Sequence, residues 1–511
     1  PVLATTATAN ARVTDDVAAQ LGSDTHVLRT SLDRESLHLS VVELPDDDHR
    51  LAWLATAFDR LDGSGIVYCL TQDRAAATAA WLNDRGARVA AYTGATDPDE
   101  RIRLEAALRA NELDALVATS ALGMGFDKGD LAFCVHLGLP PTPVAYYQQV
   151  GRAGRAIDRA EIIALPRPVE DAAVWRWFEQ VSLPAESTCW EVLDQLDGHR
   201  PTSIPSLETT VNLGRNRLQT LCKILEVDGA IRAVRGGFVR TGEWTYDTEK
   251  AERLRALRRD EAEQIRTFIT TEDCRLGYLR ACLDDEDIEP CGRCDRCTDA
   301  RWSFDPDPDM VAAAGRHLRG GDAEIEPRRI WPSGLDEPRG RIAEGDRNRW
   351  GRALCRLGDG GWGPTIDQVL TGERPLHTDM IRAVAAVLKR WDWKERPAWI
   401  CPMPSQTNAT VIDRLATGLG ELGSLPVHRA LVMDDDARPT QASMANSAHQ
   451  VANIWGRLRL DPDQWPTGEV SHGPVLLIDD FCDSRWTLTV AGAVLLDGGS
   501  GPVLPLVLRT R

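Results

Sequence analysis

Gly65-Ile66-Val67-Tyr68-Cys69-Leu70 is a short apolar run with the composition of a buried strand. Before it, apolar residues recur at the spacing of one helix face, at Leu51, Leu54, Phe58 and Leu61. Further runs, separated by helix-length segments, lie at 37–42, 89–92, 115–119, 133–137 and 161–165. Strands that alternate with helices predict a parallel sheet covered on both faces, with ligands at the carboxyl ends of the strands. This part of the chain is therefore expected to have an α/β fold.

Length and charge limit the class of protein. The 511 residues exceed what one hydrophobic core supports and suggest roughly three to four domains. With 43% apolar and 27% charged residues the composition is that of folded protein, and no run approaches the roughly 20 uncharged apolar residues of a membrane helix. The net charge of −18 excludes a global basic field, so any nucleic-acid contact must come from local patches.

A pair of arginines forms the first strong motif. Residues 146–155, YYQQVGRAGR, place Arg152 and Arg155 three positions apart with small residues between them. Both guanidinium groups could reach one polyphosphate, as arginine fingers do. Upstream, residues 117–130 follow a strand with a glycine-bearing turn that could hold phosphate or ribose. Paired arginines also make ordinary surface salt bridges, but the order and spacing of the two segments together favour a phosphate site.

These segments resemble motifs V and VI of superfamily 2 helicases and are closest to the RecQ family. Thr6-Ala7-Thr8-Ala9 resembles motif III and Ile66-Val67-Tyr68-Cys69 resembles motif IV, so the resemblance covers residues 1 to about 180. It implies a RecA-like domain of an ATP-dependent 3′ to 5′ DNA translocase and helicase.

The resemblance also implies roles for individual residues. Arg155 would be the arginine finger that stabilises charge on the transferring γ-phosphate, with Arg152 and Gln148 beside it. Asp127 and Gly125 would lie at the ATP site. The backbone of single-stranded DNA would be contacted by two hydroxyl side chains, those of Thr71 and Thr119.

The sequence departs from an intact helicase in one large respect. It contains no Gly-rich loop ending in Lys-Ser/Thr and no Asp-Glu-x-His, which hold the β- and γ-phosphates and Mg²⁺. It also begins without a methionine and, by the resemblance, at motif III. Most of the first RecA-like domain is therefore expected to be missing, and this polypeptide alone is not expected to hydrolyse ATP. ATP and Mg²⁺ would belong to the full-length enzyme.

Four cysteines form the second strong motif: Cys274 and, after sixteen residues, Cys291, Cys294 and Cys297. Thiolates on a tight turn can share one tetrahedral ion, and a fourth on a preceding helix closes the shell, which is typical of structural zinc. Iron is the alternative metal, and chance clustering of thiols is the alternative without a metal. RecQ helicases carry a similar Cys-Arg followed by Cys-Gly-x-Cys-Asp-x-Cys. The remaining cysteines, including Cys282, are expected to pack in apolar surroundings, which suggests a reducing compartment.

Residues 186–245 show short helices followed by two short strands around Gly236-Gly237, which suggests a winged helix. The segment from Pro201 to Thr245 contains six basic and four acidic residues, which gives it a small net positive charge. The candidate DNA-binding residues are Asn212, Arg215 and Arg217 in a recognition helix and Arg232 and Arg235 in the wing. A winged helix used only for packing or for a protein partner is the alternative. RecQ helicases have the zinc module before the winged helix, whereas here the order is reversed.

Residues 475–487, VLLIDDFCDSRWT, resemble the phosphoribosyl-pyrophosphate loop of type I phosphoribosyltransferases. By this resemblance Asp479 and Asp480 would bind ribose hydroxyls. The loop that follows, with Ser484 and Thr487, would wrap a 5′-phosphate with its amides.

Three residues depart from the small residues expected in that loop: Asp483, Arg485 and Trp486. A domain repurposed for structure or binding is therefore favoured over retained phosphate binding, and transferase catalysis is the least favoured reading. Arg438-Pro439-Thr440-Gln441 and Asn446 resemble the hood segment of competence-type phosphoribosyltransferases, which supports the fold but not the reaction.

Together these modules resemble the RqlH clade of bacterial RecQ-like helicases. This implies a cytoplasmic, nucleoid-associated enzyme that acts on DNA with a single-stranded 3′ tail, with the missing first RecA-like domain as its partner in cis. A phosphoribosyltransferase-like enzyme with a DNA-binding half and a non-enzymatic DNA-binding scaffold stay open as alternatives. We expect five parts along the chain. They are a remnant of the first RecA-like domain (1–35), a second RecA-like domain (36–185), a winged helix (186–245), a zinc module (246–300), and a linker with a phosphoribosyltransferase-like α/β domain (301–511).

Overall fold

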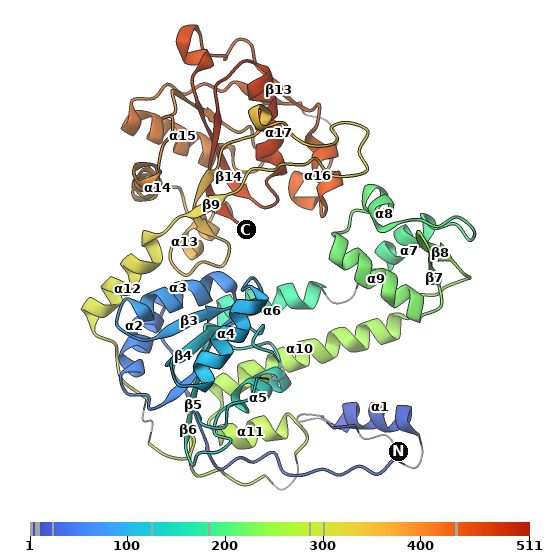
Figure 1. Cartoon of the computed structure of the whole chain (residues 1–511), viewed down its shortest axis with the longest axis vertical. Coiled ribbons are helices and arrows are strands. Elements are labelled where there is room, and N and C mark those ends of the chain that lie inside the picture. Colours follow the sequence, from blue (N-terminus) through green and yellow to red (C-terminus); the bar gives the residue numbers. More distant parts are fainter. Residues whose placement is uncertain are drawn as a thin grey trace. The chain divides into compact units, whose positions relative to one another are not determined.

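The computed structural model describes residues 4–5, 11–22, 25–123, 126–181, 184–285, 288–299, 302–434 and 438–511 (Figure 1). The chain divides into two compact units, each discontinuous in sequence. The first contains residues 1–183 and 247–319, and the second contains 184–246 and 320–511. The motif III match at 6–9 and Gly125 lie outside the described residues.

The first unit is built on a six-stranded parallel sheet in the order β1-β6-β5-β2-β4-β3. The strands are β1 (Leu37–Val41), β2 (Ser64–Cys69), β3 (Val89–Tyr92), β4 (Ala115–Ala118), β5 (Leu131–Leu137) and β6 (Ala160–Leu165). The helices of the same region are α1 (Ala11–Leu21), α2 (Asp47–Phe58), α3 (Gln72–Asn83), α4 (Pro98–Arg109), α5 (Pro143–Val150) and α6 (Pro168–Val181). The predicted α/β fold with a parallel sheet is confirmed.

Local sequence signals start these helices. Asp46, Thr71, Asp97 and Thr142 each accept a hydrogen bond from a main-chain amide in the first turn of the helix that follows. This satisfies an amide that has no partner within the helix. A proline at the first position of α4 and of α5 adds a preset backbone angle. Each connection from strand to helix is therefore specified within a few residues.

Alternating side chains of the central strand β2 enter two separate cores. Ile66 and Tyr68 pack on the face covered by α5 and α6, whereas Val67 and Cys69 pack on the face covered by α2 and α3. Such alternation is what a strand buried on both faces requires.

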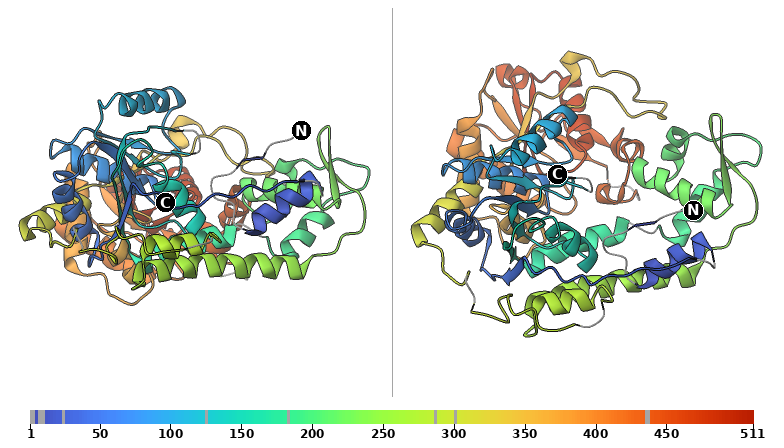
Figure 2. Two further views of the ribbon diagram at one scale, coloured as in Figure 1. Left: turned by 90° about the horizontal axis from the view of Figure 1, so that it is seen from below. Right: turned by 60° about the horizontal axis from the view of Figure 1, so that its bottom comes forward.

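Helices from further along the chain complete both faces of this sheet. These helices are α10 (Thr248–Thr270), α11 (Arg275–Ala281) and α12 (Pro308–Gly320). Phe268 of α10 joins the core beneath α5, while Trp302 and Ala314 join the opposite core. Figure 2 shows α10 as a long helix that runs beside α5 and continues past the sheet. Residues 302–319 therefore pack with the first unit, although the sequence suggested a linker there.

Residues 184–246 of the second unit form three helices and a hairpin around a small core of their own. The elements are α7 (Glu186–Asp194), α8 (Ile204–Thr210), α9 (Arg215–Val227), β7 (Ile231–Val234) and β8 (Gly237–Arg240). Gly236 and Gly237 both have positive φ, and a Cβ at Gly237 would overlap the Thr202 carbonyl oxygen at 2.1 Å. Only glycine fits this turn. The order of helices and hairpin is the one expected from the sequence.

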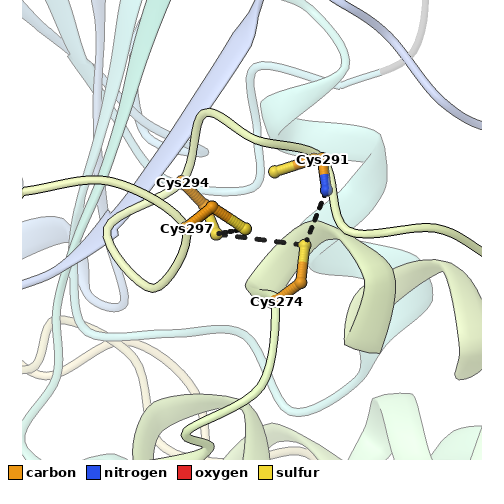
Figure 3. Close-up of side chains that lie close together, drawn as sticks. All are labelled: Cys274, Cys291, Cys294 and Cys297. Carbon is orange, nitrogen blue, oxygen red and sulfur yellow. Dashed lines mark hydrogen bonds between the residues drawn. The ribbon is translucent and has the colours of Figure 1, made fainter.

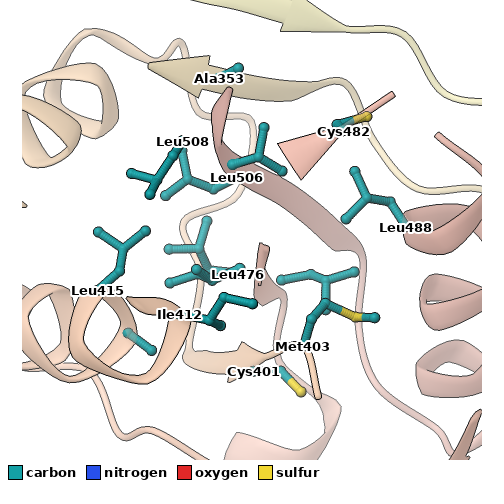
Figure 4. Packing of buried hydrophobic residues seen from close by; sticks show 14 of the residues in the cluster. Ala353, Cys401, Met403, Ile412, Leu415, Leu476, Cys482, Leu488, Leu506 and Leu508 are labelled. Carbon is teal, nitrogen blue, oxygen red and sulfur yellow. The ribbon is translucent and has the colours of Figure 1, made fainter. Parts of the chain in front are cut away.

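The rest of the second unit is a five-stranded sheet in the order β11-β14-β15-β10-β9, parallel except for β9. Its strands are β9 (Ala323–Ile325), β10 (Gly351–Arg356), β11 (Trp399–Pro402), β14 (Val475–Cys482) and β15 (Val503–Thr510), with a separate hairpin of β12 (Leu431–Met433) and β13 (Leu458–Leu460). Its helices are α13 (Gly363–Leu370), α14 (Thr378–Arg390), α15 (Ala409–Gly423), α16 (Ser447–Ile454) and α17 (Trp486–Asp497). Figure 4 shows Leu476 and Leu506 of the central strands packed with Ile412 and Leu415 of α15. Among the described helices of the whole chain, none has the length and apolarity needed to cross a bilayer.

Candidate functional site

The turn that carries the two arginines is fixed by main-chain bonds at the amino end of β5. It follows α5, and the amides of Gly154 and Ala156 donate to the carbonyls of Leu131 and Gly129 at 2.9 and 2.7 Å. Gly154 has φ +67°, and a Cβ there would lie 2.4 Å from the Ser36 hydroxyl oxygen. The close approach therefore requires glycine at this position.

Arg155 and Arg152 differ in their surroundings. Arg155 Nη1 donates to Asp127 Oδ1 at 2.8 Å, and the two side chains are 44% and 68% exposed. Arg152 is buried, and its Nη1 donates to the carbonyl of Phe126 at 3.1 Å. Gln148 is exposed on α5. Arg155 is thus accessible to a phosphate from outside, whereas Arg152 braces the segment that carries Asp127.

Two residues of the segment before β1 hold the same turn. Arg34 Nη1 and Nη2 donate to the carbonyls of Gly151 and Ala153 at 2.5 and 3.0 Å. The Ser36 hydroxyl donates to the carbonyl of Gly154 at 2.6 Å. These contacts could not be predicted from local sequence patterns, because they join residues more than 110 positions apart.

Three threonine hydroxyls follow adjacent strands at the carboxyl edge of the sheet. Thr71 follows β2, Thr119 follows β4 and Thr93 follows β3. Each hydroxyl oxygen accepts one main-chain amide, from Arg74, Ala121 and Ala95 at 3.3, 3.4 and 3.2 Å, and so keeps its own proton for another acceptor. Thr93 was not a predicted site residue, although its position directly after the apolar strand 89–92 could have indicated it.

The segment between β4 and β5 connects the threonine edge to the arginine turn. It leaves β4 at Thr119, at the carboxyl edge, and reaches Asp127 before it enters β5 at Leu131. Because β4 and β5 are parallel members of one sheet, the segment spans the full height of the sheet. A ligand bound beside Thr119 and a ligand bound beside Asp127 would therefore contact opposite ends of one segment, the one between β4 and β5.

The four predicted cysteines come together (Figure 3). Their sulfur atoms lie within 4.8 Å of one another, with Cys294 Sγ 3.5 Å from Cys297 Sγ and 4.0 Å from Cys274 Sγ. Four thiolates at about 2.3 Å from a tetrahedral ion would be about 3.8 Å apart, so the donor set fits zinc. A hydrogen bond from Cys291 lowers the pKa of the Cys294 thiol to about 4. Cys282 is not part of this group.

The four cysteines and the turn of residues 291–297, here called the cysteine module, are attached to the free edge of β1. The amide of Asp295 donates to the Leu39 carbonyl, and the amide of Val41 donates to Asp295 Oδ2, both at 2.9 Å. Asp295 also forms a buried ion pair of 2.6 Å with Arg275. These bonds cover edge groups that would otherwise be open to another strand.

Arg293, inside the cysteine turn, reaches the segment that holds the arginine turn. It donates to the carbonyls of Leu37 and Arg34 at 3.2 and 3.0 Å and pairs with Asp33. The side chain of the same Arg34 binds the turn at 151–153. The cysteine module and the arginine turn are therefore joined through one short stretch of chain.

The predicted DNA-binding residues of 184–246 fall into two groups. Arg217, Arg232 and Arg235 are exposed. Arg215 forms a bidentate pair with Glu208 at 2.7 and 3.1 Å. Asn212 is bonded to the main chain of residues 443–445.

The acids of the phosphoribosyl-like segment lie at the end of β14. Asp479 is buried, and this burial together with the neighbouring Asp480 raises the pKa of its carboxyl well above its usual range. Asn408 donates to Asp480. Protonated Asp479 would have no net charge to offer a cation, so the pair differs from two ionised carboxylates.

Three arginines contact or belong to the loop after these acids, and two of them, Arg511 and Arg328, were not indicated by the sequence. Arg511 Nη1 donates to Asp483 Oδ1 at 2.7 Å, and Arg328 Nη2 donates to the Ser484 carbonyl at 2.8 Å. Arg485 adopts φ +71° and donates to the Glu326 carbonyl at 3.1 Å. Thr487 is half-buried in the first turn of α17. The charge of Asp483 is thus balanced by Arg511.

Comparison with known proteins assigns a class to the first sheet. Residues 50–157 match the family described as helicase conserved C-terminal domain. The probable ATP-dependent DNA helicase RecS of Bacillus subtilis is 35% identical over 158 residues, which are 30% of this chain and 32% of that protein. The ATP-dependent DNA helicase RecQ of Pasteurella multocida is 30% identical over 36% of this chain and 28% of its own length. RecQ of Synechocystis is 27% identical over 58% of this chain and 62% of its own length.

The first unit therefore carries the RecA-like C-terminal domain of a superfamily 2 helicase. In this region the chain is similar to RecQ and RecS DNA helicases, as the motifs V and VI resemblance predicted. The chain spans less than two thirds of the length of each of these relatives.

Proposed function

We propose that this chain is the part of a RecQ-type ATP-dependent DNA helicase, of the RqlH kind, that supplies the arginine finger and the DNA-binding modules. The observation that carries the proposal is the exposed pair of Arg155 and Asp127 in a RecQ-like helicase domain. Arg155 is held by this exposed ion pair and by one bond from its Nε to the Gly151 carbonyl at 3.2 Å, and a guanidinium with such weak surface partners can exchange the carboxylate for a phosphate.

In the proposed reaction ATP binds between this domain and a phosphate-binding RecA-like domain that holds Mg²⁺. Closure of the two domains brings Arg155 to the γ-phosphate, where its charge stabilises the transition state. The ion pair between Asp127 and Arg155 then breaks, and the Asp127 carboxylate can accept a hydrogen bond from a ribose hydroxyl. Arg152 keeps the 126–130 segment in place. The sequence contains no Gly-Lys-Thr/Ser loop, so hydrolysis needs a first RecA-like domain that supplies this loop.

DNA would run along the carboxyl edge of the sheet. The hydroxyls of Thr71, Thr93 and Thr119 donate hydrogen bonds to phosphates of a single DNA strand. Such phosphate contacts do not depend on the base sequence. Residues 184–246 act as a winged helix whose wing arginines Arg232 and Arg235 contact the duplex next to a single-stranded 3′ tail. The four cysteines hold one structural zinc ion that takes no part in the chemistry.

The test is Arg155→Ala in the complete protein that carries this chain. DNA-stimulated ATPase is expected to fall roughly 10³-fold, because an arginine finger contributes about that much to phosphoryl transfer. Binding of a 3′-tailed duplex is expected to change less than twofold. Arg103→Ala is the matched control, since Arg103 is also exposed and paired with one carboxylate, on α4. ATPase retained by Arg155→Ala would refute the assignment.

A second candidate function rests on Asp479 and Asp480 at the end of β14. Their position supports a phosphoribosyl-pyrophosphate site, whereas Arg328 at the Ser484 carbonyl and Asp483 in the loop oppose it. We propose that the domain is retained for structure or binding and does not catalyse transfer. Calorimetric titration with phosphoribosyl pyrophosphate and Mg²⁺ is expected to show no heat of binding, and binding with product formation would favour the transferase. A scaffold without activity would bind tailed duplex but show no ATPase in the complete protein.

A further inference from the structure

The corner between α8 and α9 is bonded to the C-terminal α/β domain of the same unit. The side-chain amide of Asn446 donates to three main-chain carbonyls of this corner, those of Glu208, Val211 and Leu213, at 2.9, 2.9 and 3.3 Å. Asn446 is 6% exposed, and its side-chain oxygen accepts the His449 amide at the start of α16. The side-chain nitrogen of Asn446 therefore donates, and its side-chain oxygen accepts, hydrogen bonds within the fold.

Asn212 makes the reciprocal contact. Its Nδ2 donates to the Ser443 carbonyl at 2.8 Å, and its Oδ1 accepts from the Ala445 amide at 2.6 Å. A Cβ at Gly214, the residue before α9, would lie 3.4 Å from the Ala445 carbonyl oxygen. The segment of residues 443–446 thus lies directly against the amino-terminal end of α9. Asn212, a predicted DNA contact, is bonded to this segment.

This interface is polar and does not join the two hydrophobic cores. Among the described residues, the core of 184–246 contains only side chains of that segment, and the core of the α/β domain starts at Ala323. Gly334 also lies against α8, where an added Cβ would be 2.1 Å from the Thr209 methyl group. An interface made mainly of such polar and small contacts opens more readily than a shared apolar core. The contact is therefore suited to a reversible role.

We infer that residues 443–446 are a latch that competes with DNA for the amino-terminal end of α9. The segment resembles the hood of phosphoribosyltransferases, and in this chain it covers a helix corner. In the latched state the exposed wing residues Arg232 and Arg235 remain accessible, whereas the side-chain amide of Asn212 is already bonded at both its nitrogen and its oxygen. The inference rests on the proposed DNA-binding role of residues 184–246.

Asn446→Asp tests the latch in the whole chain. An aspartate keeps the oxygen that caps α16 but cannot donate to the three carbonyls, so it opens the contact without removing the helix cap. Hydrogen exchange of the Ala445 amide is expected to rise. The affinity for a 3′-tailed duplex is expected to increase about tenfold, because opening raises the fraction of chains able to bind. The added negative charge would by itself weaken DNA binding, so an increase cannot come from electrostatics.

Ser443→Ala is the matched control. It alters the same segment, but only the Ser443 carbonyl, not its hydroxyl, contacts Asn212. Exchange at Ala445 and DNA affinity should both stay at the wild-type level. Faster exchange in Asn446→Asp with unchanged or weaker DNA binding would overturn the competition. Unchanged exchange would overturn the latch itself. If no variant binds DNA, the proposed DNA-binding role fails, while the exchange data still report on the contact.

Discussion

Arg152 and Arg155 show how burial separates two residues that look equivalent in sequence. Three positions apart on a turn, they bond to consecutive residues of one segment but differ in burial: Arg152 bonds to the Phe126 carbonyl and is buried, while Arg155 is exposed beside Asp127. The sequence predicted that both guanidinium groups reach one polyphosphate. That role stays a prediction for both, and the geometry makes Arg155 the accessible one.

His136 provides a test of burial at the same scale. It lies in β5 between the rings of Tyr68 and Tyr146, at 5.0 and 4.9 Å, and its Nε2 is 3.0 Å from Gln149 Oε1. Burial lowers the pKa of His136 from 6.5 to about 3. The folded state therefore favours neutral imidazole, so its contribution to stability is complete above pH 6.5 and is lost as the pH falls towards 3.

We expect the first unit to be destabilised by about 2.7 kcal/mol at pH 4.5, because His136 then binds a proton in the unfolded chain but not in the folded one. This pH lies two units below the unfolded pKa, at about 1.36 kcal/mol each. His136→Gln, which cannot titrate, should show a smaller loss of amide protection in β5 between pH 7 and pH 4.5. His26→Gln, at an exposed position, is the control and should behave as the wild type. An equal pH dependence in His136→Gln would contradict the role of this histidine.

At the scale of elements, the main feature is the covered edge of β1. This strand ends the sheet, and the cysteine module supplies its missing partner through Asp295 and Arg293. The turn of residues 291–297 has no apolar side chain besides its three cysteines, so its shape depends on the ion that the thiols can bind.

Removal of the metal should therefore expose β1. The protein is expected to contain about one zinc per chain, and a strong chelator should increase hydrogen exchange of residues 37–41 more than tenfold while residues 64–69 of β2 stay protected. Cys297→Ser should reproduce the effect, and Cys282→Ser should not, since Cys282 lies outside the thiol group. Full protection of β1 after complete loss of metal would show that the module holds its shape without an ion.

At the scale of the whole molecule, each unit is assembled from two separated stretches of chain. Residues 184–246 lie in sequence between the two stretches of the first unit. Phe268, Leu276 and Leu279 of the later stretch fill the core on one side of the helicase sheet, and Trp302 and Ala314 fill the other. Residues 1–183 alone would leave both of these surfaces and the edge of β1 open.

A truncated chain of residues 1–183 is accordingly expected to aggregate on expression. Co-expression with residues 247–319 should restore a soluble complex, because the missing helices and the cysteine module return together. Sedimentation of the two preparations checks this. A monomeric, folded 1–183 fragment would contradict the expectation.

The sequence predicted the features that depend on local patterns. The alternating apolar runs predicted the α/β sheet, and the spacing of four cysteines predicted a cluster that the structure brings together. Contacts such as those of Arg34 with Gly151 or Asn446 with Val211 leave no periodic signal, because their partners are more than 100 residues away. The strands β9 and β10 leave little signal for a related reason: they have three and six residues, and β10 pairs with the distant β15.

The segment before β1 is fastened along its length. Arg29 donates to the Leu283 carbonyl, the amide of Leu32 donates to Asp285, and Arg34 holds the turn at 151–153. A connection tied at three successive points moves as part of the body to which it is tied. In the proposed helicase cycle, we therefore expect the pivot of the phosphate-binding domain to lie on the amino-terminal side of Arg29. Lengthening the chain there should change the domain motion without disturbing the arginine turn.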